Sequence, residues 1–237
     1  MKLRGALVAA TMMALPLAAN AQAVNGLYVG AGLGINMMHD ETIKALGSAA
    51  VGGSGIQSKL GPAIILSGGW GFGNGLRAEI EGSYRYNQLG QISNPSDAST
   101  FGGTEQKYGV MVNALYDFVG LVPGVQPYVG VGLGYQFAQV KAGGAVGGTA
   151  YNIGTATKGA LAYQAILGAA MPIQTAPGLA LTAEYRFMGM AGDRVYTGTV
   201  GGASATTTLG ANFNHSVLLG LRYNFGAAPA PAPAAVT

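Results

Sequence analysis

Apolar residues alternate with polar residues or glycine along eight stretches of the chain, and this alternation restricts the possible folds more than any other feature. Residues 76–87, LRAEIEGSYRYN, show it best: the even positions hold apolar residues, aromatic residues or glycine, and all the charges fall on odd positions. Successive side chains of a β-strand point to opposite faces, so this period of two predicts strands. The predicted strands are 27–36, 62–73, 76–87, 105–118, 125–137, 158–171, 179–188 and 214–225.

Every charged residue inside these strands falls on the polar face. The set is Arg77, Glu79, Glu81, Arg85, Glu105, Lys107, Asp117, Lys158, Glu184, Arg186 and Arg222. If the other face meets lipid, a misplaced Lys or Arg at the bilayer midplane would cost about 2 to 4 kcal/mol. A register slip of one residue is therefore excluded in each charged strand.

Composition favours a membrane protein. Charged residues make up 9% of the chain, against roughly 25% in ordinary soluble domains. The charge-free stretch 119–140 is long enough for a membrane helix, but five glycines and two prolines disfavour a helix there by roughly 11 kcal/mol. The period of two in the same stretch favours a strand.

The N-terminus has the plan of a secretory signal peptide. Lys2 and Arg4 precede an apolar run that ends at Ala18, and small residues follow. We expect a signal peptide over residues 1–21, with cleavage after Ala21 or, alternatively, after Ala23. Its removal leaves ten basic groups (12 − 2) against nine acidic ones. That near-balance gives no reason to expect a nucleic-acid partner.

The connections alternate between short and long. Residues 74–75, 119–124 and 172–178 are short turns, whereas 37–61, 88–104, 138–157 and 189–213 are long and rich in small polar residues. We therefore predict an all-β fold over residues 22–225, an eight-stranded antiparallel up-and-down transmembrane β-barrel. Three short periplasmic turns and four long external loops join its strands. The even strand number places both chain ends in the periplasm, and residues 226–237 form a Pro/Ala-rich linker or tail.

The outward-facing aromatic residues are expected to form two girdles, one at each edge of the membrane. The predicted periplasmic girdle is Trp70, Phe72, Tyr116, Phe118, Tyr223 and Phe225. The predicted external girdle is Tyr84, Tyr86, Tyr108, Tyr135, Phe137, Tyr185 and Phe187.

A glycine motif occurs twice, as YVGAGLG at 28–34 and YVGVGLG at 128–134. The spacing differs from the G-x-G-x-x-G pattern of dinucleotide sites. In a strand all these glycines share one face. Because the interior of an eight-stranded barrel is only wide enough to be filled by side chains, we expect the glycines to make room there for longer groups of other strands.

Several motifs together resemble the OmpA-like outer-membrane β-barrel family. They are YVGAGLG, YGVMVNALYDF at 108–118, PYVGVGLGYQF at 127–137, AYQAILGAA at 162–170, AEYRFMG at 183–189 and NHSVLLGLRYNF at 214–225. The resemblance implies a Gram-negative outer-membrane protein that supports envelope integrity and presents loops for adhesion to host or surface ligands. It also implies contact with outer-membrane lipids and lipopolysaccharide, and recognition of the terminal Phe225 by the barrel insertion machinery. Peptidoglycan is an expected partner only if the natural chain is longer.

The predicted lumen charges admit two interpretations. They either pair and close the barrel, because buried charges persist only when paired, or they form a gate. A small pore or a conduit for small or apolar solutes is the alternative function. Catalysis is not expected, because His215 and Ser216 are adjacent on a strand and point to opposite faces. His39, Asp40 and Glu41 have no defined metal spacing, and no cofactor is expected.

Overall fold

The computed structural model describes residues 23–39, 41–46, 55–93, 100, 102–146 and 148–227. The predicted signal peptide and all but two residues of the predicted tail lie outside these ranges. Within them, no helix is long and apolar enough to cross a membrane.

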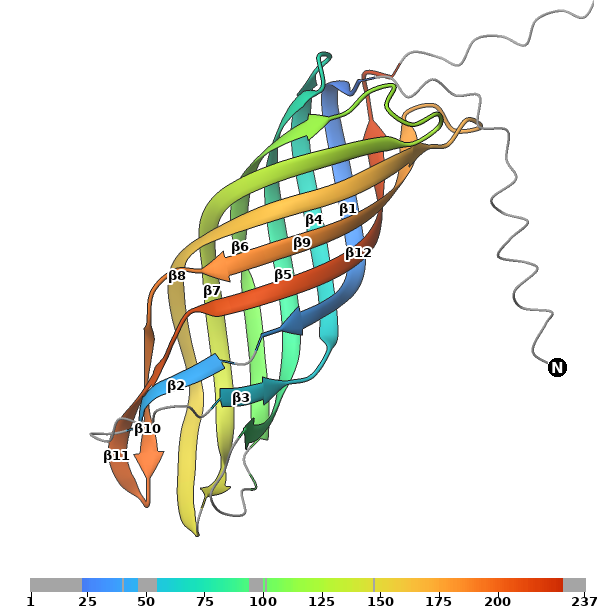
Figure 1. The fold of residues 1–237 in the computed structure, drawn as a ribbon. Helices are drawn as coiled ribbons and strands as arrows, with labels where there is room; N and C mark the ends of the chain where they lie inside the picture. The colour runs from blue at the N-terminus through green and yellow to red at the C-terminus, as the bar shows by residue number, and fades with distance from the viewer. Residues whose placement is uncertain are drawn as a thin grey trace, which may run out of the picture.

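In the described part of the chain, twelve strands form one antiparallel sheet (Figure 1). Their bounds are β1 (Asn25–Met38), β2 (Glu41–Leu46), β3 (Gly55–Ser58), β4 (Gly61–Phe72), β5 (Leu76–Ser93), β6 (Gly102–Asp117), β7 (Gln126–Val146), β8 (Thr149–Pro172), β9 (Leu179–Met190), β10 (Arg194–Val200), β11 (Ala203–Leu209) and β12 (Asn212–Asn224).

Eight of these strands close a barrel. Going around it, the order is β1, β4, β5, β6, β7, β8, β9 and β12, and β12 pairs again with β1. Both ends of the barrel chain meet at the end that carries the short turns, where Phe225 N donates to Leu27 O at 3.0 Å. The predicted eight-stranded antiparallel barrel is confirmed.

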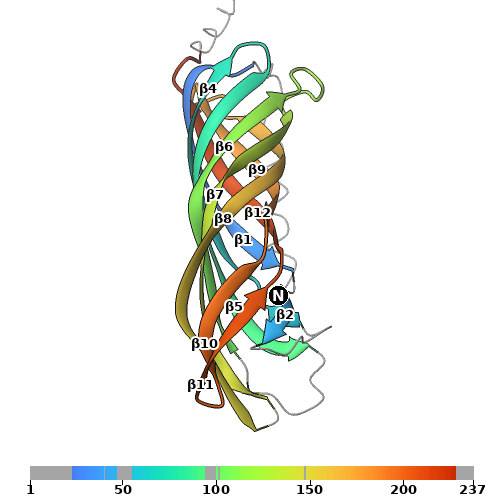
Figure 2. The same ribbon diagram turned by 90° about the vertical axis from the view of Figure 1, so that its left-hand side faces the viewer.

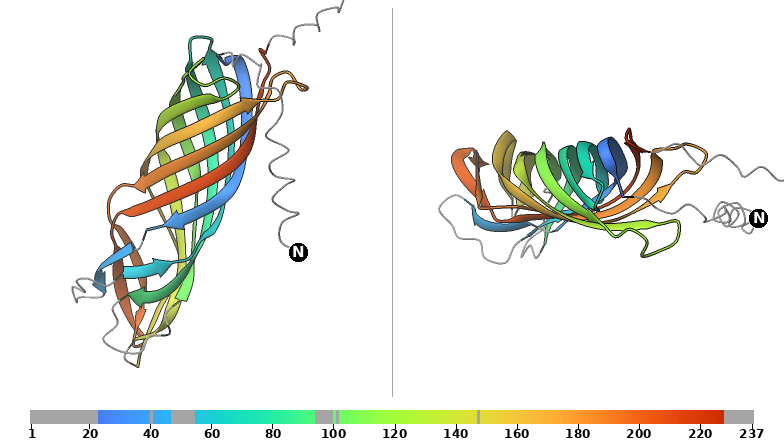
Figure 3. Two further views of the ribbon diagram at one scale, coloured as in Figure 1. Left: turned by 45° about the vertical axis from the view of Figure 1, so that its right-hand side comes forward. Right: turned by 90° about the horizontal axis from the view of Figure 1, so that it is seen from above.

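The segments predicted as long loops contain further strands. Strands β5, β6, β7 and β8 continue past the ends of β1, β4, β9 and β12, as Figure 2 shows. At this end β2, β3, β10 and β11 complete the sheet between β5 and β8 (Figure 3). The extension arises because paired neighbours satisfy the backbone of Gly/Thr/Ala-rich segments that lack a strong apolar alternation.

The inward face follows the predicted parity, and glycines make room on it. A Cβ at Gly30 would lie 2.7 Å from Ser67 Oγ, and one at Gly134 would lie 2.7 Å from Met111 Sδ. At Gly132 it would collide with the Asn113 amide. The expected role of the repeated motif is thus confirmed at these positions, whereas a Cβ at Gly32 would meet only ordinary contacts, the nearest at 3.8 Å.

The buried apolar side chains are layered along the barrel axis. Met111, Met188 and Met190 belong to one cluster within the barrel. A separate cluster, which includes Met38 and Tyr196, fills the extension beyond it. The charged side chains described next are buried in the same interior.

Candidate functional site in the barrel lumen

Ten of the eleven charged residues predicted to face the lumen are buried or half-buried there. Nine are at most 7% exposed, and Glu184 is half-buried with 16% of its side chain exposed. Because these groups come from strands on all sides of the barrel, their pairing decides what the lumen contains.

Near the short-turn end, Arg77 on β5 binds Asp117 on β6. Arg77 Nε and Nη2 lie 2.9 to 3.0 Å from the Asp117 oxygens. The guanidinium also lies between two aromatic rings, 5.2 Å from the centroid of Tyr28 and 4.8 Å from that of Tyr128. Cation–π contact adds to a fork-shaped ion pair, so Arg77 is held from three sides.

The next layer is organised around Glu81 on β5. Glu81 Oε2 accepts hydrogen bonds from Asn113 Nδ2 at 2.7 Å and from Gln164 Nε2 at 2.8 Å, and it also binds Arg186 Nη1. Arg186 Nε in turn binds Glu184 Oε2 at 2.8 Å. Strands β6, β8 and β9 therefore converge on one carboxylate from β5, and two of the three bonds cross the lumen.

At the long-strand end, Glu105 on β6 binds two cations. Its Oε1 lies 3.0 Å from Lys107 Nζ and 3.3 Å from Arg194 Nη1. Arg194 Nη2 also donates to Gly210 O at 3.2 Å. Burial lowers the pKa of Arg194, and it raises the pKa of the neighbouring Tyr196 to about 12.

Arg85 and Arg222 are bound by neutral groups. Arg85 donates to Ser216 Oγ at 3.2 Å and to Ser83 Oγ at 3.0 Å. Arg222 donates to Gln126 Oε1 at 3.0 Å. Among the described residues, no carboxylate lies within ion-pair distance of either guanidinium, so the full-pairing interpretation does not extend to them.

Lys158 was expected in the lumen, and this expectation is wrong. Lys158 is exposed although it has the inward parity. The reason is that β9 leaves β8 at the Ala162–Met190 pair, while β10 pairs with β8 only at Tyr151 and Asn152. Residues 154–160 of β8 pair with β7 alone within the described part of the chain, so no second strand covers Lys158, and five of these seven residues are exposed.

Sequence reasoning missed several members of the lumen network. Tyr28 and Tyr128 share the parity of the glycines in the repeated motif, and that parity was the available signal. Arg194 lay in a segment predicted as a loop. A row of amides and a hydroxyl also crosses the lumen, including Asn36, which donates to Asn87 Oδ1 at 2.7 Å and to Asn214 Oδ1 at 2.9 Å.

The thirteen predicted girdle residues all lie on the outer face, with Tyr86 and Phe187 half-buried and the others exposed. They are Trp70, Phe72, Tyr84, Tyr86, Tyr108, Tyr116, Phe118, Tyr135, Phe137, Tyr185, Phe187, Tyr223 and Phe225. Ring contacts join members of the same predicted girdle, such as Tyr108 with Phe137 at 5.7 Å and Tyr223 with Phe225 at 4.9 Å.

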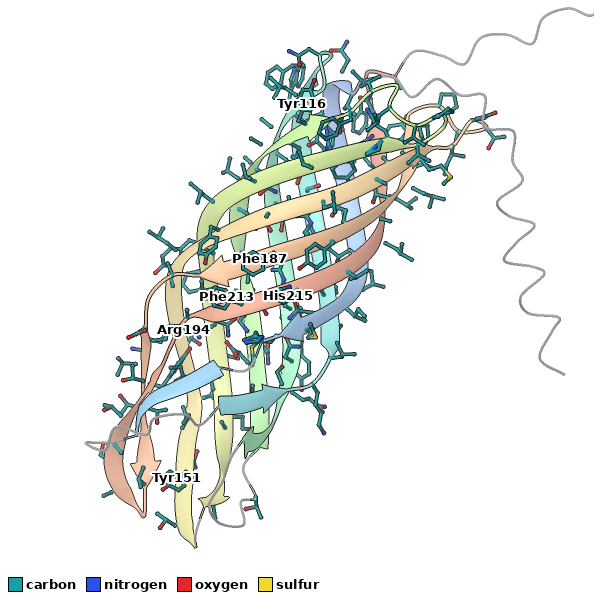
Figure 4. All side chains as sticks on the ribbon, in the orientation of Figure 1. Tyr116, Tyr151, Phe187, Arg194, Phe213 and His215 are labelled. Atoms are coloured by element: carbon teal, nitrogen blue, oxygen red, sulfur yellow. The ribbon has the colours of Figure 1, made fainter. Side chains whose placement is uncertain are left out.

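His215 belongs to the same outer surface. Its ring lies 5.3 Å from that of Phe187, close to Phe213, as Figure 4 shows. Its Nδ1 lies 2.6 Å from Tyr185 Oη. Ser216 points into the lumen instead, where its Oγ donates to Asn36 Oδ1 at 2.7 Å. The two side chains lie on opposite faces, as predicted, and do not form a nucleophile–base pair.

The described residues contain no group of three or more His, Cys, Asp or Glu side chains placed to hold a metal ion. Of the three residues considered as a loose ion site, His39 is exposed. Asp40 and the side chain of Glu41 lie outside what the structure describes.

Known proteins resemble this chain in sequence and in fold. A family model described as outer membrane protein beta-barrel domain matches residues 5–225. A protein of Gluconacetobacter diazotrophicus named "Outer membrane protein" is 38% identical over 251 residues, an alignment that covers 97% of this chain. The chain spans 65% of the length of that relative.

Two solved structures align with this chain over most of both lengths. OprG of Pseudomonas aeruginosa aligns over 86% of this chain and 98% of its own, with 11% identity and a TM-score of 0.57. Neisserial surface protein A aligns over 85% and 99%, with 19% identity and a TM-score of 0.48. At such identities the likeness to OprG speaks for the fold alone.

Proposed function

The chain belongs to the outer membrane protein β-barrel family and lies in the outer membrane of a Gram-negative bacterium; from this premise we propose that it is a structural barrel with a closed lumen. In this role it contributes to envelope integrity, and its external strands and loops interact with surface ligands. The proposal assigns it no catalytic step.

The observation that carries the proposal is the convergence on Glu81. Bonds from Gln164 and Arg186 to this carboxylate cross the lumen, and all three side chains are buried. The cavity beside Arg222 measures about 30 Å³, room for about two water molecules. Both features favour a plugged interior over a continuous water path.

Conductance in planar bilayers tests closure. We expect the wild-type barrel to show no steady conductance, and Glu81→Ala to produce frequent openings because it removes the shared acceptor. Lys158→Ala is the matched control, since Lys158 is a charged residue of the same sequence pattern that lies outside the network. Urea unfolding of each variant establishes that the barrel is folded. A stable, ion-selective conductance of the wild-type protein would contradict closure.

The external extension supports the surface role. The strands at this end carry the chain past the external girdle, and the tips of β7 and β8 lie furthest from the short turns (Figure 1). We extend the proposal to outer-membrane lipids and to the insertion machinery acting on Phe225. Peptidoglycan is proposed as a partner only if the natural chain is longer.

A second function, a conduit for apolar solutes, is favoured by the interrupted pairing of β8. Ala156 and Ala160 are half-buried in the stretch that pairs with β7 alone, and each packs against a different apolar cluster. Release of an apolar fluorescent tracer from proteoliposomes tests this. Release that is faster than from protein-free vesicles and slowed by Ala160→Trp would favour a conduit, whereas equal rates would dismiss it.

A further inference from the structure

A groove at the external tip of the barrel lies across the ends of β6, β7 and β8. Its volume is about 470 Å³, within the range of ligand clefts. Four of its nine lining residues are glycines, namely Gly102, Gly103, Gly143 and Gly144. Because these residues have no side chains, a ligand can approach the backbone closely.

The polar groups of the groove are few and are of the kinds that bind a phosphorylated sugar. Among the lining residues that the structure describes, Lys141 supplies the only charge, and its side chain is exposed. Thr104, Tyr151 and Asn152 supply hydroxyl and amide groups. Asn152 Oδ1 accepts a hydrogen bond from Gly154 N at 2.7 Å, which fixes the amide while occupying only its oxygen. Figure 4 shows Tyr151 near the tip of the extension, where it lines the groove.

The attraction of an anion to the groove depends on Lys141 itself. Outside the lumen, the charged side chains that the structure describes are Lys59, Lys141, Lys158 and Asp193. The sequence of the same external segments adds Lys44, Asp40, Glu41 and Asp97, so basic and acidic groups balance there. A nearby cation, and not a net charge of the rim, therefore favours a phosphate in the groove.

The height of the groove identifies the layer it meets. Lys141 follows the girdle residue Phe137 by four positions along β7, which is roughly 13 Å along a strand and about 10 Å along a tilted barrel. The lining residues therefore lie just beyond the hydrocarbon edge, among the headgroups of the outer leaflet. In a Gram-negative outer membrane these headgroups are the phosphorylated sugars of lipopolysaccharide.

We propose that this groove binds the phosphorylated saccharide of lipopolysaccharide in the same membrane. Lys141 pairs with a phosphate, while Thr104, Tyr151 and Asn152 contact the sugar. The inference deepens the surface role proposed above and rests on it. It does not depend on closure of the lumen. A conducting wild-type barrel would contradict closure alone, and a lack of saccharide binding at the groove would contradict this inference alone.

The experiment measures binding of purified lipopolysaccharide to the full chain folded in detergent, with dephosphorylated lipopolysaccharide as the second probe. We expect Lys141→Gln to weaken binding about tenfold, the loss typical of one charge-assisted hydrogen bond. Dephosphorylation should weaken wild-type binding similarly and have little further effect on Lys141→Gln. Lys59→Gln removes the same charge from the rim outside the groove and should bind like wild type.

Three results would overturn the proposal. One is equal binding by Lys141→Gln and Lys59→Gln, and another is equal affinity of the wild type for phosphorylated and dephosphorylated lipopolysaccharide. The third is tighter binding of a soluble sulfated polysaccharide, which would assign the groove to ligands from outside the cell. Unchanged fluorescence of Trp70 in each variant ensures that lost binding reflects the groove and not unfolding.

Discussion

Arg77 binds Asp117 through two guanidinium nitrogens at 2.9 to 3.0 Å, and both side chains are at most 2% exposed. Removing one partner of a buried pair leaves an uncompensated charge, which typically costs about 3 to 5 kcal/mol. We predict that Asp117→Ala lowers the free energy of unfolding by about that amount. The measurement is a urea titration in lipid vesicles that follows the fluorescence of Trp70, the only tryptophan.

The double variant Arg77→Met, Asp117→Leu is the control, since it removes both charges and retains apolar volume. Such replacements are often neutral, so it should be more stable than Asp117→Ala alone. A single variant within about 1 kcal/mol of wild type would show that water, and not Asp117, compensates Arg77.

The second prediction concerns Gly168, which faces the Tyr128 ring across β7 and β8. A Cβ at this position would lie 2.7 Å from Tyr128 Oη and closer still to ring carbons. Gly168→Ala should therefore displace the ring, break its 2.5 Å bond to Glu184 Oε1 and destabilise the barrel by about 1 to 3 kcal/mol.

A double-mutant cycle with Tyr128→Ser separates this clash from a backbone effect. Without the ring, Gly168→Ala should lower the free energy of unfolding much less. Gly82→Ala is the matched control: Gly82 is in a strand and exposed, and its Cβ would meet nothing within 4 Å. Equal destabilisation by both alanine variants would contradict the packing role of Gly168.

The barrel itself could be predicted from the sequence because lipid penalises charge on one face of each strand. Residues 76–87 show this well, since all four charged positions are buried as their parity requires. Lys158 shows the limit of the same argument. Parity gives the direction of a side chain but not whether a neighbouring strand covers it, and β9 has already ended at that level.

The β10–β11 hairpin was not predicted, although a signal was present. Gly201 and Gly202 have φ of +58° and +85° and join a run that contains Val, Tyr and Thr to a Thr-rich run, which is the pattern of a two-residue hairpin turn. Arg194 lies at the start of this hairpin, so its bond to Glu105 could not be anticipated while the segment counted as a loop. Long-range ion pairs depend on which strands meet, and spacing along one strand does not reveal that.

The signal peptide gives a third prediction. Cleavage after Ala21 would leave Gln22 as the first residue, and cleavage after Ala23 would leave Val24. Either product keeps β1 complete, because this strand begins at Asn25. N-terminal sequencing of protein extracted from outer membranes should identify Gln22, and retention of Met1 would refute processing at either site.

The last prediction concerns pH and Tyr196, which is fully buried in the external extension. Burial raises the pKa of this phenol from its ordinary value of 10.0 to about 12, and nearby Glu105 acts in the same direction while Arg194 opposes it. Below pH 10 the phenol is neutral in both the folded and the unfolded chain, so its full contribution to the free energy of unfolding is present. Between pH 10 and 12 the phenol ionises only in the unfolded chain, so the free energy of unfolding should fall by up to about 3 kcal/mol.

Tyr196→Phe tests this assignment because it removes the titrating group and keeps the ring. The urea midpoint of the wild-type barrel should fall more steeply than that of the variant between pH 10 and 11.5, and the two curves should run parallel below pH 9. The absorbance difference between the two proteins at 295 nm should show the Tyr196 phenolate appearing above pH 11. If that phenolate appears near pH 10, the extension admits water around Tyr196, and the apolar cluster that contains it does not seal the external end of the lumen.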